Sequence, residues 1–443
     1  MRRVIVVGAG VAGLSAAIRM AEAGLAVDLV EARERIGGRV WTEHPPGIEA
    51  PVELGAEFVH GKVDEIWRYQ RPGKIDLYEG LGSRWCEQDG RLAICDYFEQ
   101  VNEVLGRVSK YSGPDIPFQQ FLDNLGEIQP QVRQRVLNYV MGFHAADPRE
   151  IGVRAIQIDS EAEERTEGDR TFRIRQGYDA LLRHLQWECE RLGVRISLAE
   201  VVRRIDWGGH GVRVDVGDSE KSLDAECVVV TLPIGVLQAG PGDAGYVEFS
   251  PPLREKESAL GKLVLGHVRR VTFVFDEVFW SNTELVGRND MADLQFLFTD
   301  DDFFPTWWSY EPLRLPVLTA WSPALKSDRL AGKSTEEVIE IALTSLSKAL
   351  DVKIGALRKK VVSAHSHDWI TDRFTRGAYS YAKAGGADGF RELSEPLDNK
   401  LYFAGEATEF TGHHATVHGA IATGERAANE VLAHMNVASV HNG

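Results

Sequence analysis

A glycine-rich turn near the amino terminus constrains the fold of this chain more than any other feature. A short apolar run, Val4 to Val7, leads directly into a G-x-G-x-x-G turn at Gly8, Gly10 and Gly13, and a helical pattern follows. An all-apolar run of this kind is typical of a parallel strand covered on both faces. The first glycine permits the tight turn, the second lets backbone approach a pyrophosphate, and the third lets helix and strand pack closely. The sequence therefore predicts a Rossmann-like α/β domain that binds a dinucleotide.

The next strand pattern strengthens this prediction. The segment "AVDLVEA" carries Glu31, 18 residues after Gly13, where an acid that binds ribose hydroxyls is expected. The amino terminus of the intervening helix would face the phosphates with its partial positive charge. The residues predicted to contact the dinucleotide here are Gly8, Gly10, Val11, Ala12, Gly13, Glu31, Ala32 and Arg33. This half of the motif does not separate NAD from FAD.

Length and composition exclude several other classes of protein. A chain of 443 residues is too long for one ordinary core, so two domains are expected. The net charge of -16 argues against nucleic acid as a partner. The four cysteines show no metal-binding spacing, which predicts no metal site and favours reduced thiols in a cytoplasmic protein. No apolar run approaches the roughly 20 residues that span a bilayer, so no membrane partner is expected.

The residues after Glu31 narrow the choice of cofactor. In "EARERIGGRV", Gly37, Gly38 and Arg39 follow the acid directly. With this segment the chain resembles the FAD-dependent flavin amine oxidase superfamily, which includes monoamine oxidases, polyamine oxidases and flavin histone demethylases. In that family a second glycine pair and an arginine lie along the FAD pyrophosphate, and the resemblance assigns this role to Gly38 and Arg39.

Two further segments resemble the same family and imply more of the cofactor site. "ELGAEFVHG" looks like the segment beneath the flavin ring, which implies flavin contacts from Gly55, Ala56, Glu57 and Phe58. "KLYFAGEATEFTGHHATVHGAIATGERAANEVL" is similar to the family along its whole length, and "HATVHGA" is closest to the demethylase and polyamine oxidase branches. The contacts implied by the resemblance there come from Gly405, Glu406, Ala415, Thr416 and Val417, and backbone at Val202 is expected to hold the adenine. A helix beginning near Thr416 would favour the negative charge of reduced flavin.

The resemblance and the apolar patterns together predict a discontinuous arrangement of domains. The FAD-binding domain, Rossmann-like and of the glutathione-reductase type, is expected at 1–75, 171–247 and 392–443. A mixed α+β substrate domain is expected at 76–170 and 248–391. Apolar residues at helical spacing over 101–108, 118–125 and 132–143 predict helices, interpreted as core stripes. "LGHVRRVTFVFDEVFW" predicts a buried strand that carries Arg269 and Arg270.

The family resemblance also implies roles in catalysis. Tyr379 matches one position of an aromatic pair beside the substrate nitrogen, and Thr416 falls on the other. Ala378 lies where monoamine oxidases carry a cysteine bonded to flavin, so the FAD is expected to be non-covalent. Most of the family has a lysine that holds a water against the flavin N5 where this chain has Arg270. Arginine can anchor a water but cannot readily give up its proton.

Several alternatives stay open from the sequence. Arg270 either replaces the family lysine or pairs with a carboxylate at a domain boundary, and His60 either lines the substrate tunnel or is structural. Trp307 and Trp308 form either a lid or an ordinary core pair. A buried charge needs a partner or a function, so Arg270 is the most informative of these residues.

The reaction implied by the resemblance is oxidation of the C–N bond of a small-molecule amine to an imine by hydride transfer to flavin. Hydrolysis would then release an aldehyde or ketone and an amine, and dioxygen or another acceptor would reoxidise the flavin. The protein is expected to be a monomer or homodimer. The alternatives are a desaturase or protoporphyrinogen-oxidase-like enzyme, an L-amino-acid oxidase, and a non-catalytic flavin-binding protein. The carboxylate-binding arginine of many L-amino-acid oxidases is missing after Gly55 and Ala56.

Overall fold

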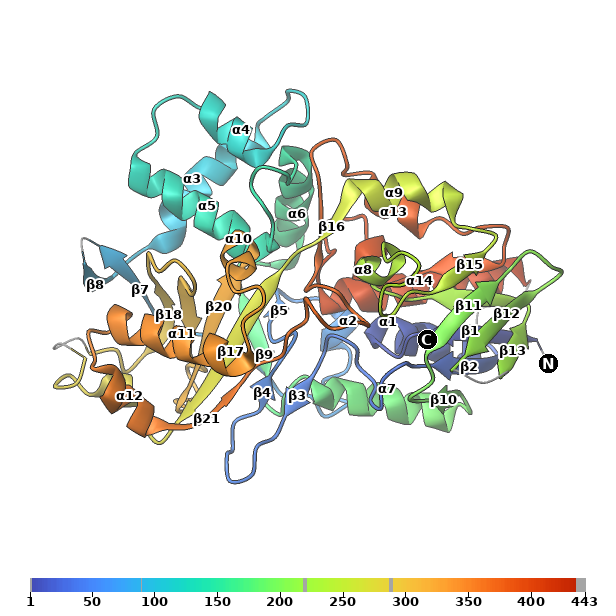
Figure 1. Ribbon diagram of the computed structural model, residues 1–443, viewed down its shortest axis with the longest axis horizontal. Helices are drawn as coiled ribbons and strands as arrows, with labels where there is room; N and C mark the ends of the chain where they lie inside the picture. The colour runs from blue at the N-terminus through green and yellow to red at the C-terminus, as the bar shows by residue number, and fades with distance from the viewer. Residues whose placement is uncertain (1, 89, 218–220, 287–289, 436–443) are drawn as a thin grey trace.

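The computed structural model describes residues 2–88, 90–217, 221–286 and 290–435 and contains two regions of different architecture (Figure 1). On the right of Figure 1, five parallel strands form a sheet in the order β10-β2-β1-β14-β23. They are β10 (Arg195–Ser197), β2 (Ala26–Val30), β1 (Arg3–Val7), β14 (Cys227–Val230) and β23 (Leu401–Phe403). Distant parts of the chain therefore build one sheet.

This parallel sheet lies between helices and a second sheet. Val4 and Val6 of β1 pack with three helices, α1 (Val11–Glu22), α7 (Asp179–Arg191) and α14 (Val417–His434). Ile5 and Val7 pack on the other face with a four-stranded sheet. That sheet comprises β13 (Ser222–Ala225), β12 (Val212–Val216), β11 (Val202–Asp206) and β15 (Glu248–Ser250). Because successive strand residues point to opposite faces, burial on both sides explains why β1 is apolar throughout.

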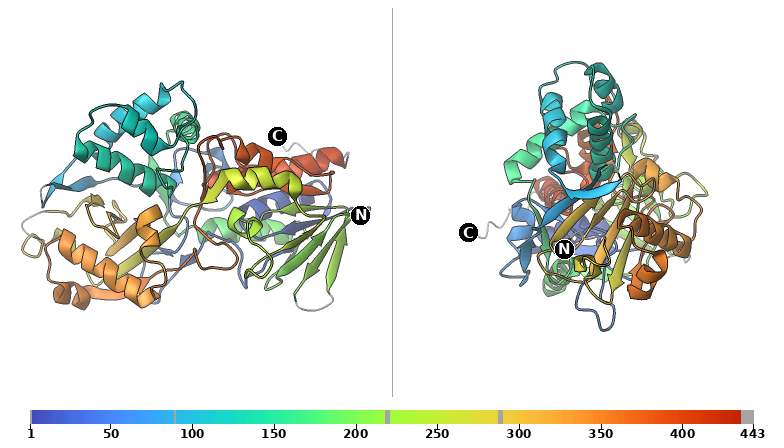
Figure 2. Two further views of the ribbon diagram at one scale, coloured as in Figure 1. Left: turned by 45° about the horizontal axis from the view of Figure 1, so that its top comes forward. Right: turned by 90° about the vertical axis from the view of Figure 1, so that its left-hand side faces the viewer.

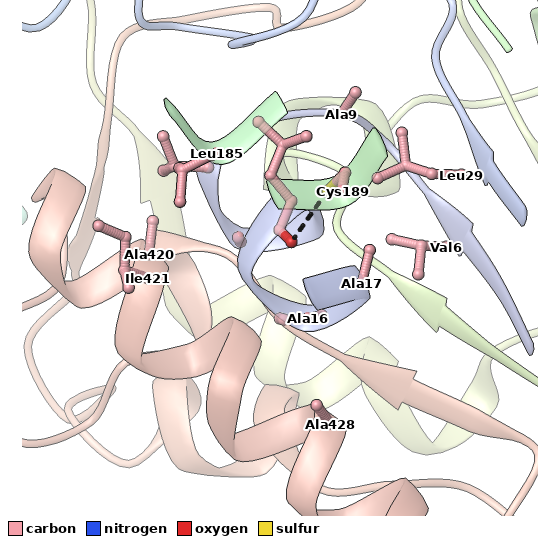
Figure 3. Packing of buried hydrophobic residues seen from close by; sticks show 14 of the residues in the cluster. Val6, Ala9, Ala16, Ala17, Leu29, Leu185, Cys189, Ala420, Ile421 and Ala428 are labelled. Carbon is pink, nitrogen blue, oxygen red and sulfur yellow. Dashed lines mark hydrogen bonds between the residues drawn. The ribbon is translucent and has the colours of Figure 1, made fainter. Parts of the chain in front are cut away.

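Small side chains let α1 lie close to its neighbours. Figure 3 shows Ala16 and Ala17 of α1 in the packed interior, with Ala428 of α14 nearby. Cys189 of α7 lies over α1 and its Sγ donates to the carbonyl oxygen of Leu14 at 3.8 Å. Burial raises the pKa of this thiol to about 12, so Cys189 is a packing residue and not a reactive one.

The second region combines a seven-stranded sheet with helices on both sides (Figure 2). Its strands, in sheet order, are β21 (Val361–His365), β17 (Val268–Phe275), β20 (Val317–Pro323), β19 (Thr306–Trp308), β18 (Leu294–Phe298), β7 (Ser83–Gln88) and β8 (Arg91–Ile94). One group of helices comprises α3 (Tyr97–Ser109), α4 (Phe118–Asn124), α5 (Pro130–His144) and α6 (Val153–Thr166). On the other side, α11 (Thr335–Ala349) and α12 (Ile354–Lys360) pack against the sheet. The predicted fold class, a Rossmann-like cofactor domain with a mixed α+β second domain, is confirmed.

Shorter elements complete the fold. The strands are β3 (Thr42–Glu43), β4 (Val52–Glu53), β5 (Val59–His60), β6 (Leu77–Glu79), β9 (Thr171–Ile174), β16 (Leu263–Leu265) and β22 (Ser380–Ala382). The helices are α2 (Asp64–Trp67), α8 (Ile234–Leu237), α9 (Glu257–Lys262), α10 (Ala324–Asp328) and α13 (Gly389–Ser394), with 3-10 turns at Arg254–Lys256, Phe279–Ser281 and Glu406–Thr408. Among the described residues, no helix has the length and apolar character needed to cross a membrane.

The three helices and the buried strand predicted in the second region are present, as α3, α4, α5 and β17. Every residue of β17 is buried, including Arg269 and Arg270. One interpretation is wrong in part: the stripe on α5 is not all core, because Tyr139 and Phe143 line a cavity. Their rings stack at an interplanar angle of 8° with centroids 5.5 Å apart. One side of this helix therefore packs in the core, and its edge lines the cavity.

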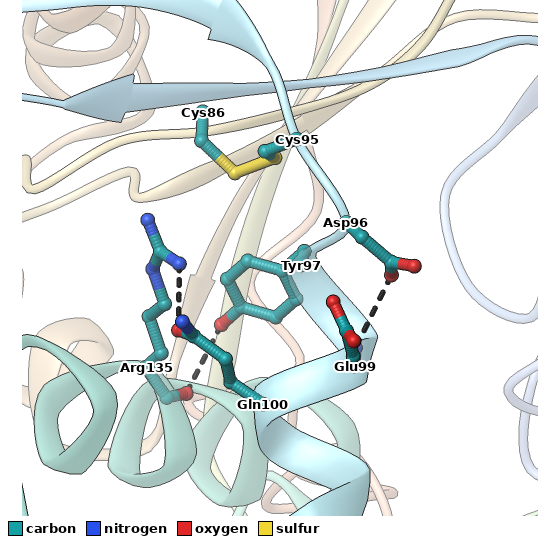
Figure 4. The surroundings of a disulfide bond; sticks show 7 residues. All are labelled: Cys86, Cys95, Asp96, Tyr97, Glu99, Gln100 and Arg135. Carbon is teal, nitrogen blue, oxygen red and sulfur yellow. Dashed lines mark hydrogen bonds between the residues drawn. A yellow bond between two sulfur atoms is a disulfide. The ribbon is translucent and has the colours of Figure 1, made fainter.

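The expectation that all cysteines are reduced thiols is also wrong. Cys86 on β7 and Cys95, just before α3, form a disulfide with their Cα atoms 5.8 Å apart (Figure 4). Cys189 and Cys227 are free and buried. The sequence separation of nine residues gave no sign of this pair, because the hairpin formed by β7 and β8 brings the two side chains together.

We propose the domain division 1–75, 171–247 and 392–443 against 76–170 and 248–391. All five strands of the parallel sheet fall in the first three segments. β15, just past residue 247, adds an edge strand to the neighbouring four-stranded sheet. Residues 436–443, at the end of the third segment, lie outside the described residues.

Candidate active site

A cavity of about 950 Å³ lies between the two regions, and both contribute to its walls. Every residue that the sequence predicts to contact cofactor or substrate lines this cavity except Gly13. They comprise Gly8, Gly10, Val11, Ala12, Glu31, Ala32, Arg33, Gly38, Arg39, Gly55, Ala56, Glu57, Phe58, His60, Val202, Arg270, Tyr379, Gly405, Glu406, Ala415, Thr416 and Val417. Segments far apart in the chain thus meet at one place.

The first glycine turn has the geometry that its motif predicts. Gly8 has a φ of 106°, and a Cβ there would lie 2.5 Å from Thr231 Oγ1. A Cβ on Gly13 would lie 1.9 Å from the carbonyl oxygen of Gly8, which explains why Gly13 serves packing and does not reach the cavity. A Cβ on Gly10 would meet nothing within 4 Å. The backbone at Gly10 is therefore open toward the cavity, as a phosphate cradle requires.

The second glycine turn packs against the first, and Glu31 is fixed beside both. The amide of Gly37 donates to the carbonyl oxygen of Ala9 at 2.8 Å. Glu31 Oε2 accepts from the amide of Ala9 at 2.8 Å and Oε1 accepts from the amide of Arg33 at 2.9 Å. Burial raises the pKa of Glu31. Each carboxylate oxygen has a second lone pair, so both can still accept from ribose hydroxyls.

Glu406 connects the carboxy-terminal half of the site to Arg39. Arg39 Nη1 donates to Glu406 Oε1 at 2.7 Å and to the carbonyl oxygen of Ala378 at 2.8 Å. Glu406 Oε2 accepts from Ser380 Oγ at 2.5 Å and from the amide of Ala415 at 3.0 Å. Burial alone would raise the pKa of Glu406, but Arg39 and the hydrogen bond from Ser380 bring it below its ordinary value. Glu406 therefore holds the Arg39 side chain and the loop before α14 in fixed positions.

Arg270 lies beside the loop that follows Glu53. Its Nη1 donates to the carbonyl oxygen of Gly55 at 2.7 Å, and its Nη2 donates to Glu57 Oε2. Glu57 Oε1 accepts from Arg173 Nε at 2.7 Å, and Trp308 Nε1 lies 3.0 and 3.1 Å from the two carboxylate oxygens. Arg270 therefore pairs with a carboxylate, as one of the two alternatives from the sequence expected. Its Nε is buried and finds no hydrogen-bond partner among the described residues.

Three other residues expected to act in catalysis surround the same space. Tyr379 donates from its hydroxyl to the carbonyl oxygen of Phe143 at 3.0 Å, and burial raises its pKa. Thr416 caps α14, because its Oγ1 accepts from the amide of Gly419 at 2.9 Å. This confirms that the helix begins at Val417. His60 has a buried Nδ1 without a partner in the described chain, and burial lowers its pKa to about 4.

An apolar pocket lined by aromatic residues was expected for amine oxidation, but apart from Trp308 the members of this aromatic wall were not assigned to it from the sequence. Its members come from α3, α5 and the seven-stranded sheet, and they are Tyr97, Phe98, Tyr139, Phe143, Phe296, Phe298, Trp308 and Trp321. Of the two alternatives for Trp307 and Trp308, a core pair or a lid, each describes one residue. Trp307 lies in a hydrophobic cluster, and Trp308 lines the cavity. Alternation along β19 could have separated the two, but only once a strand had been predicted there.

Acidic and imidazole groups on α6 and nearby loops form another part of the wall. The Asp159 carboxylate lies 3.3 Å from the Nδ1 atoms of both His144 and His414. The carboxyl group of Glu163, one turn further along α6, has no hydrogen-bond or ion-pair partner among the described residues. Burial raises its pKa to about 7, against a lowering by His144. Both carboxyl groups line the cavity. In the sequence, only the spacing of four residues between Asp159 and Glu163 indicated that these two acids lie on the same face of a helix.

Comparison with known proteins agrees with this geometry. The family described as "Flavin containing amine oxidoreductase" matches residues 11–77 and 104–432. Polyamine oxidase 3 of Oryza sativa subsp. japonica is 30% identical over 463 residues, which cover 96% of this chain and 88% of the relative. Lysine-specific histone demethylase 2 of Homo sapiens is 26% identical over 463 residues, which cover 98% of this chain and 53% of the relative.

Solved structures show the same fold. Putrescine oxidase bound to putrescine superposes with a TM-score of 0.80 at 21% identity, covering 98% of this chain and 99% of that one. Cyclohexylamine oxidase from Brevibacterium oxydans IH-35A gives a TM-score of 0.78 at 20% identity, with coverage of 98% and 99%.

The fold and the site together define a flavoprotein oxidoreductase. The chain belongs to the flavin-containing amine oxidoreductase family. The predicted family and the predicted reaction class, oxidation of an amine, are thereby confirmed. The desaturase and L-amino-acid oxidase alternatives are not favoured by these relatives.

Proposed function

We propose that the protein binds FAD without a covalent bond and oxidises a small amine that carries a second cationic group. The observation that supports this most directly is the continuity of the cavity, which runs from the cradle at Gly10 and Glu31 to the aromatic wall and Arg270. A dinucleotide has the length to occupy both ends of such a site. No cysteine is among the described residues of the cavity wall, and Ala378 stands where a tethering cysteine would be.

The residues present fit FAD. Gly10 leaves room for a diphosphate, Glu31 keeps lone pairs for a ribose, and the start of α14 suits a negative charge at the far end of the ring. Arg39 would face the diphosphate with the part of its guanidinium that Glu406 does not use. Backbone at Val202 would meet the adenine. When bound, FAD supplies the acceptor for the hydride equivalent that leaves the carbon next to the amine nitrogen.

The protein groups around the reacting carbon would orient the amine and exclude water. Tyr379 would stand beside the substrate nitrogen, held upright by its hydrogen bond to Phe143. Thr416 presents a small side chain on the opposite side, which leaves space for a substituted amine. His60, neutral at physiological pH, has a free nitrogen that can accept a hydrogen bond from the amine.

Arg270 would anchor a water or contact the flavin directly. Its Nε–H is a buried donor without an acceptor in the described part of the chain, and an unsatisfied buried donor is costly to the folded state. A guanidinium keeps its proton at any physiological pH. Arg270 would therefore act as a fixed donor and cation, never as a base.

The acidic part of the wall supports a diamine or polyamine as substrate. Asp159 and Glu163 have no lysine or arginine partner among the described residues, so a cationic ligand group would compensate them. Relatives named polyamine oxidase and putrescine oxidase fit this class of substrate. A buried carboxylate becomes far more favourable once it is paired.

Further parts of the proposal concern the partners and location of the enzyme. Dioxygen would take the two electrons and two protons removed from the amine and become hydrogen peroxide, and the imine would hydrolyse to an aldehyde or ketone and an amine. We expect a monomer or homodimer. The sequence favoured the cytoplasm because its cysteines were expected to be free, and the Cys86–Cys95 disulfide weakens that argument, since such bonds are rare in reducing compartments.

An anaerobic half-reaction tests the proposal. The purified FAD-loaded protein is mixed with diamines, polyamines, arylalkylamines, cyclic secondary amines and amino acids, and the visible flavin absorbance is followed. Rapid bleaching by amines with a second cationic group is expected, and admitting air should restore the colour with formation of hydrogen peroxide. No bleaching by any amine, in a protein whose FAD is still reduced by dithionite, would contradict the proposed activity.

A further inference from the structure

Three buried charges lie at the cavity wall and directly behind it. The side chains of Glu57, Arg173 and Arg270 are 2%, 3% and 5% exposed, so water does not compensate their charges. We call these three residues the Glu57 cluster. Burial alone would raise the pKa of Glu57, but Arg270 and Arg173 hold it below its ordinary value. The carboxylate is therefore ionised, and a guanidinium keeps its proton at physiological pH.

The geometry of the Glu57 cluster is fixed on every side. The two oxygens of Glu57 are divided between Arg173 and Arg270, and the indole of Trp308 donates between them. Arg173 Nη2 also donates to the carbonyl oxygen of Ser309 at 2.9 Å. Because its acceptor positions are occupied, the carboxylate cannot turn toward the cavity without losing a buried hydrogen bond.

The charges of the Glu57 cluster do not balance. Two guanidiniums face one carboxylate, which leaves one positive charge in excess. Glu53 is a further acid that interacts with both Glu57 and Arg270, and burial raises its pKa to about 8. Glu53 accepts hydrogen bonds from the amide of Tyr178 and from Thr42 Oγ1, which hold it in place, but at neutral pH it is mostly uncharged. The phenols of Tyr78 and Tyr310, the other titratable neighbours of Arg173, have raised pKa values and are neutral as well.

An excess buried charge is expensive unless a ligand neutralises it. Only one end of the Glu57 cluster reaches the cavity: Arg270 and Glu57 line it, whereas Arg173 does not. Arg270 is also bonded to the carbonyl oxygen of Gly55, in the loop that forms this part of the wall. The positive potential of the cluster is therefore presented where the flavin ring is proposed to lie.

We propose that the Glu57 cluster is a built-in site for one negative charge on the cofactor ring, with Arg173 as a positioning residue that supplies the excess charge from behind Glu57. The site would bind the reduced, anionic flavin more tightly than the oxidised, neutral flavin. This inference rests on the proposed flavin site but not on the identity of the amine.

The test measures the midpoint potential of the bound flavin in the holoenzyme by spectroelectrochemistry. Arg173→Gln removes the excess charge, and Arg173→Lys keeps it while losing the planar fork. The glutamine variant should lower the relative affinity for reduced over oxidised cofactor by about tenfold, as expected for a unit charge in an interior of effective dielectric about 20. For a two-electron couple this is a shift of about 30 mV to more negative values. The lysine variant should stay close to the wild type.

A second variant gives the opposite sign. Glu57→Gln keeps the shape of the side chain but leaves both guanidiniums uncompensated, so the potential should move to more positive values. If one of the two variants fails to fold with FAD, the other still shows whether the midpoint potential shifts in the expected direction. An unchanged potential in a folded Arg173→Gln or Glu57→Gln protein would overturn the proposal. Equal shifts in Arg173→Gln and Arg173→Lys would also overturn it, because packing would then explain the effect.

Failure of this proposal is distinguishable from failure of the proposed function. The potential is measured without any amine, so a protein that no amine reduces can still show both shifts. If the excess charge instead binds a substrate carboxylate, Arg173→Gln would raise the KM for amino acids and leave the potential unchanged. That outcome would overturn the inference.

Discussion

Arg270 donates from Nη1 to the carbonyl oxygen of Gly55 at 2.7 Å, which joins strand β17 to the loop that lines the cavity floor. The same guanidinium binds Glu57, two residues further along that loop. Two of its three nitrogens therefore hold the loop, and the buried Nε has no hydrogen-bond partner among the described residues. A structural contact and an unused donor occur in one side chain, so Arg270 can position the loop and contact the cofactor at once.

The first prediction separates these two roles of Arg270. Arg270→Met removes the cation and its donors, and we expect the rate of flavin reduction to fall by roughly 10²–10³, the usual cost of losing one preorganised donor. Arg270→Lys should recover part of this rate because it restores a cation and a donor. Anaerobic stopped-flow at saturating amine measures the rate, and a thermal melt of each variant controls for folding. Wild-type reduction and reoxidation in a folded Arg270→Met protein would leave Arg270 with a structural role alone.

The second prediction concerns the two glycines of the first turn. Gly13→Ala places a Cβ 1.9 Å from the carbonyl oxygen of Gly8, so α1 must move away from β1. We expect a loss of roughly 1–3 kcal/mol in the free energy of unfolding of the apoprotein, as for overpacked cores, with weaker FAD binding as well. Chemical denaturation and FAD titration measure the two effects.

Gly10→Ala is the matched control. A Cβ at Gly10 meets nothing within 4 Å, and its φ of -69° suits any residue. The stability of the apoprotein should therefore fall by no more than about 1 kcal/mol, because alanine is a poorer helix amino cap than glycine but clashes with nothing here. FAD binding should still weaken, because the methyl group projects where the diphosphate is proposed to lie. Unchanged FAD affinity in Gly10→Ala would contradict the proposed position of the diphosphate.

Local patterns in the sequence predicted the cofactor end of the fold well. The three glycines, the apolar run in β1 and the acid at Glu31 are close together in the chain, and each has a steric or hydrogen-bonding role that neighbouring residues decide. The start of α14 at Val417 was predictable for the same reason, because Thr416 is a local cap.

The proposed substrate end of the cavity depends on contacts between distant residues and was much less predictable. Arg270 and Glu57 are 213 residues apart, and Arg173 joins them from a third segment. Neither charge pattern nor spacing indicates which acid a buried arginine will meet. Helical spacing placed Tyr139 and Phe143 on the buried side of α5 but could not show that this side ends at a cavity, since both environments select the same aromatic residues.

The third prediction tests the disulfide. Cys86 and Cys95 hold β7 to the residue before Asp96, Tyr97 and Phe98, all three of which line the cavity. Removing the bond with Cys86→Ser should lower the free energy of unfolding by about 2–4 kcal/mol, the usual contribution of a disulfide. A reducing agent should have the same effect on the wild type and none on the Cys86→Ser/Cys95→Ser double variant. Alkylation under non-reducing denaturation should modify two thiols, those of Cys189 and Cys227, and modification of four would contradict the bond.

The fourth prediction follows from the raised pKa of Glu163. Burial brings this pKa from 4.5 to about 7, so between those values the native state holds more protons than the unfolded state. The contribution of Glu163 to stability is therefore fully present below about pH 4.5 and declines as the pH rises through 7. Glu163→Gln cannot ionise, and its stability should decline less than that of the wild type over this range. Denaturation measured at several pH values checks the difference.

Substrate selectivity should show the opposite trend with pH. A second ammonium group pairs only with the ionised carboxylate, so the wild type should prefer a diamine over a monoamine of equal chain length increasingly as the pH rises from 6 to 8. Taking the ratio of the two kcat/KM values largely cancels deprotonation of the reacting nitrogen, which both substrates need. In Glu163→Gln this ratio should be lower and nearly independent of pH. A ratio that rises with pH equally in both proteins would mean that another group, such as Asp159 with its two histidines, binds the second cation.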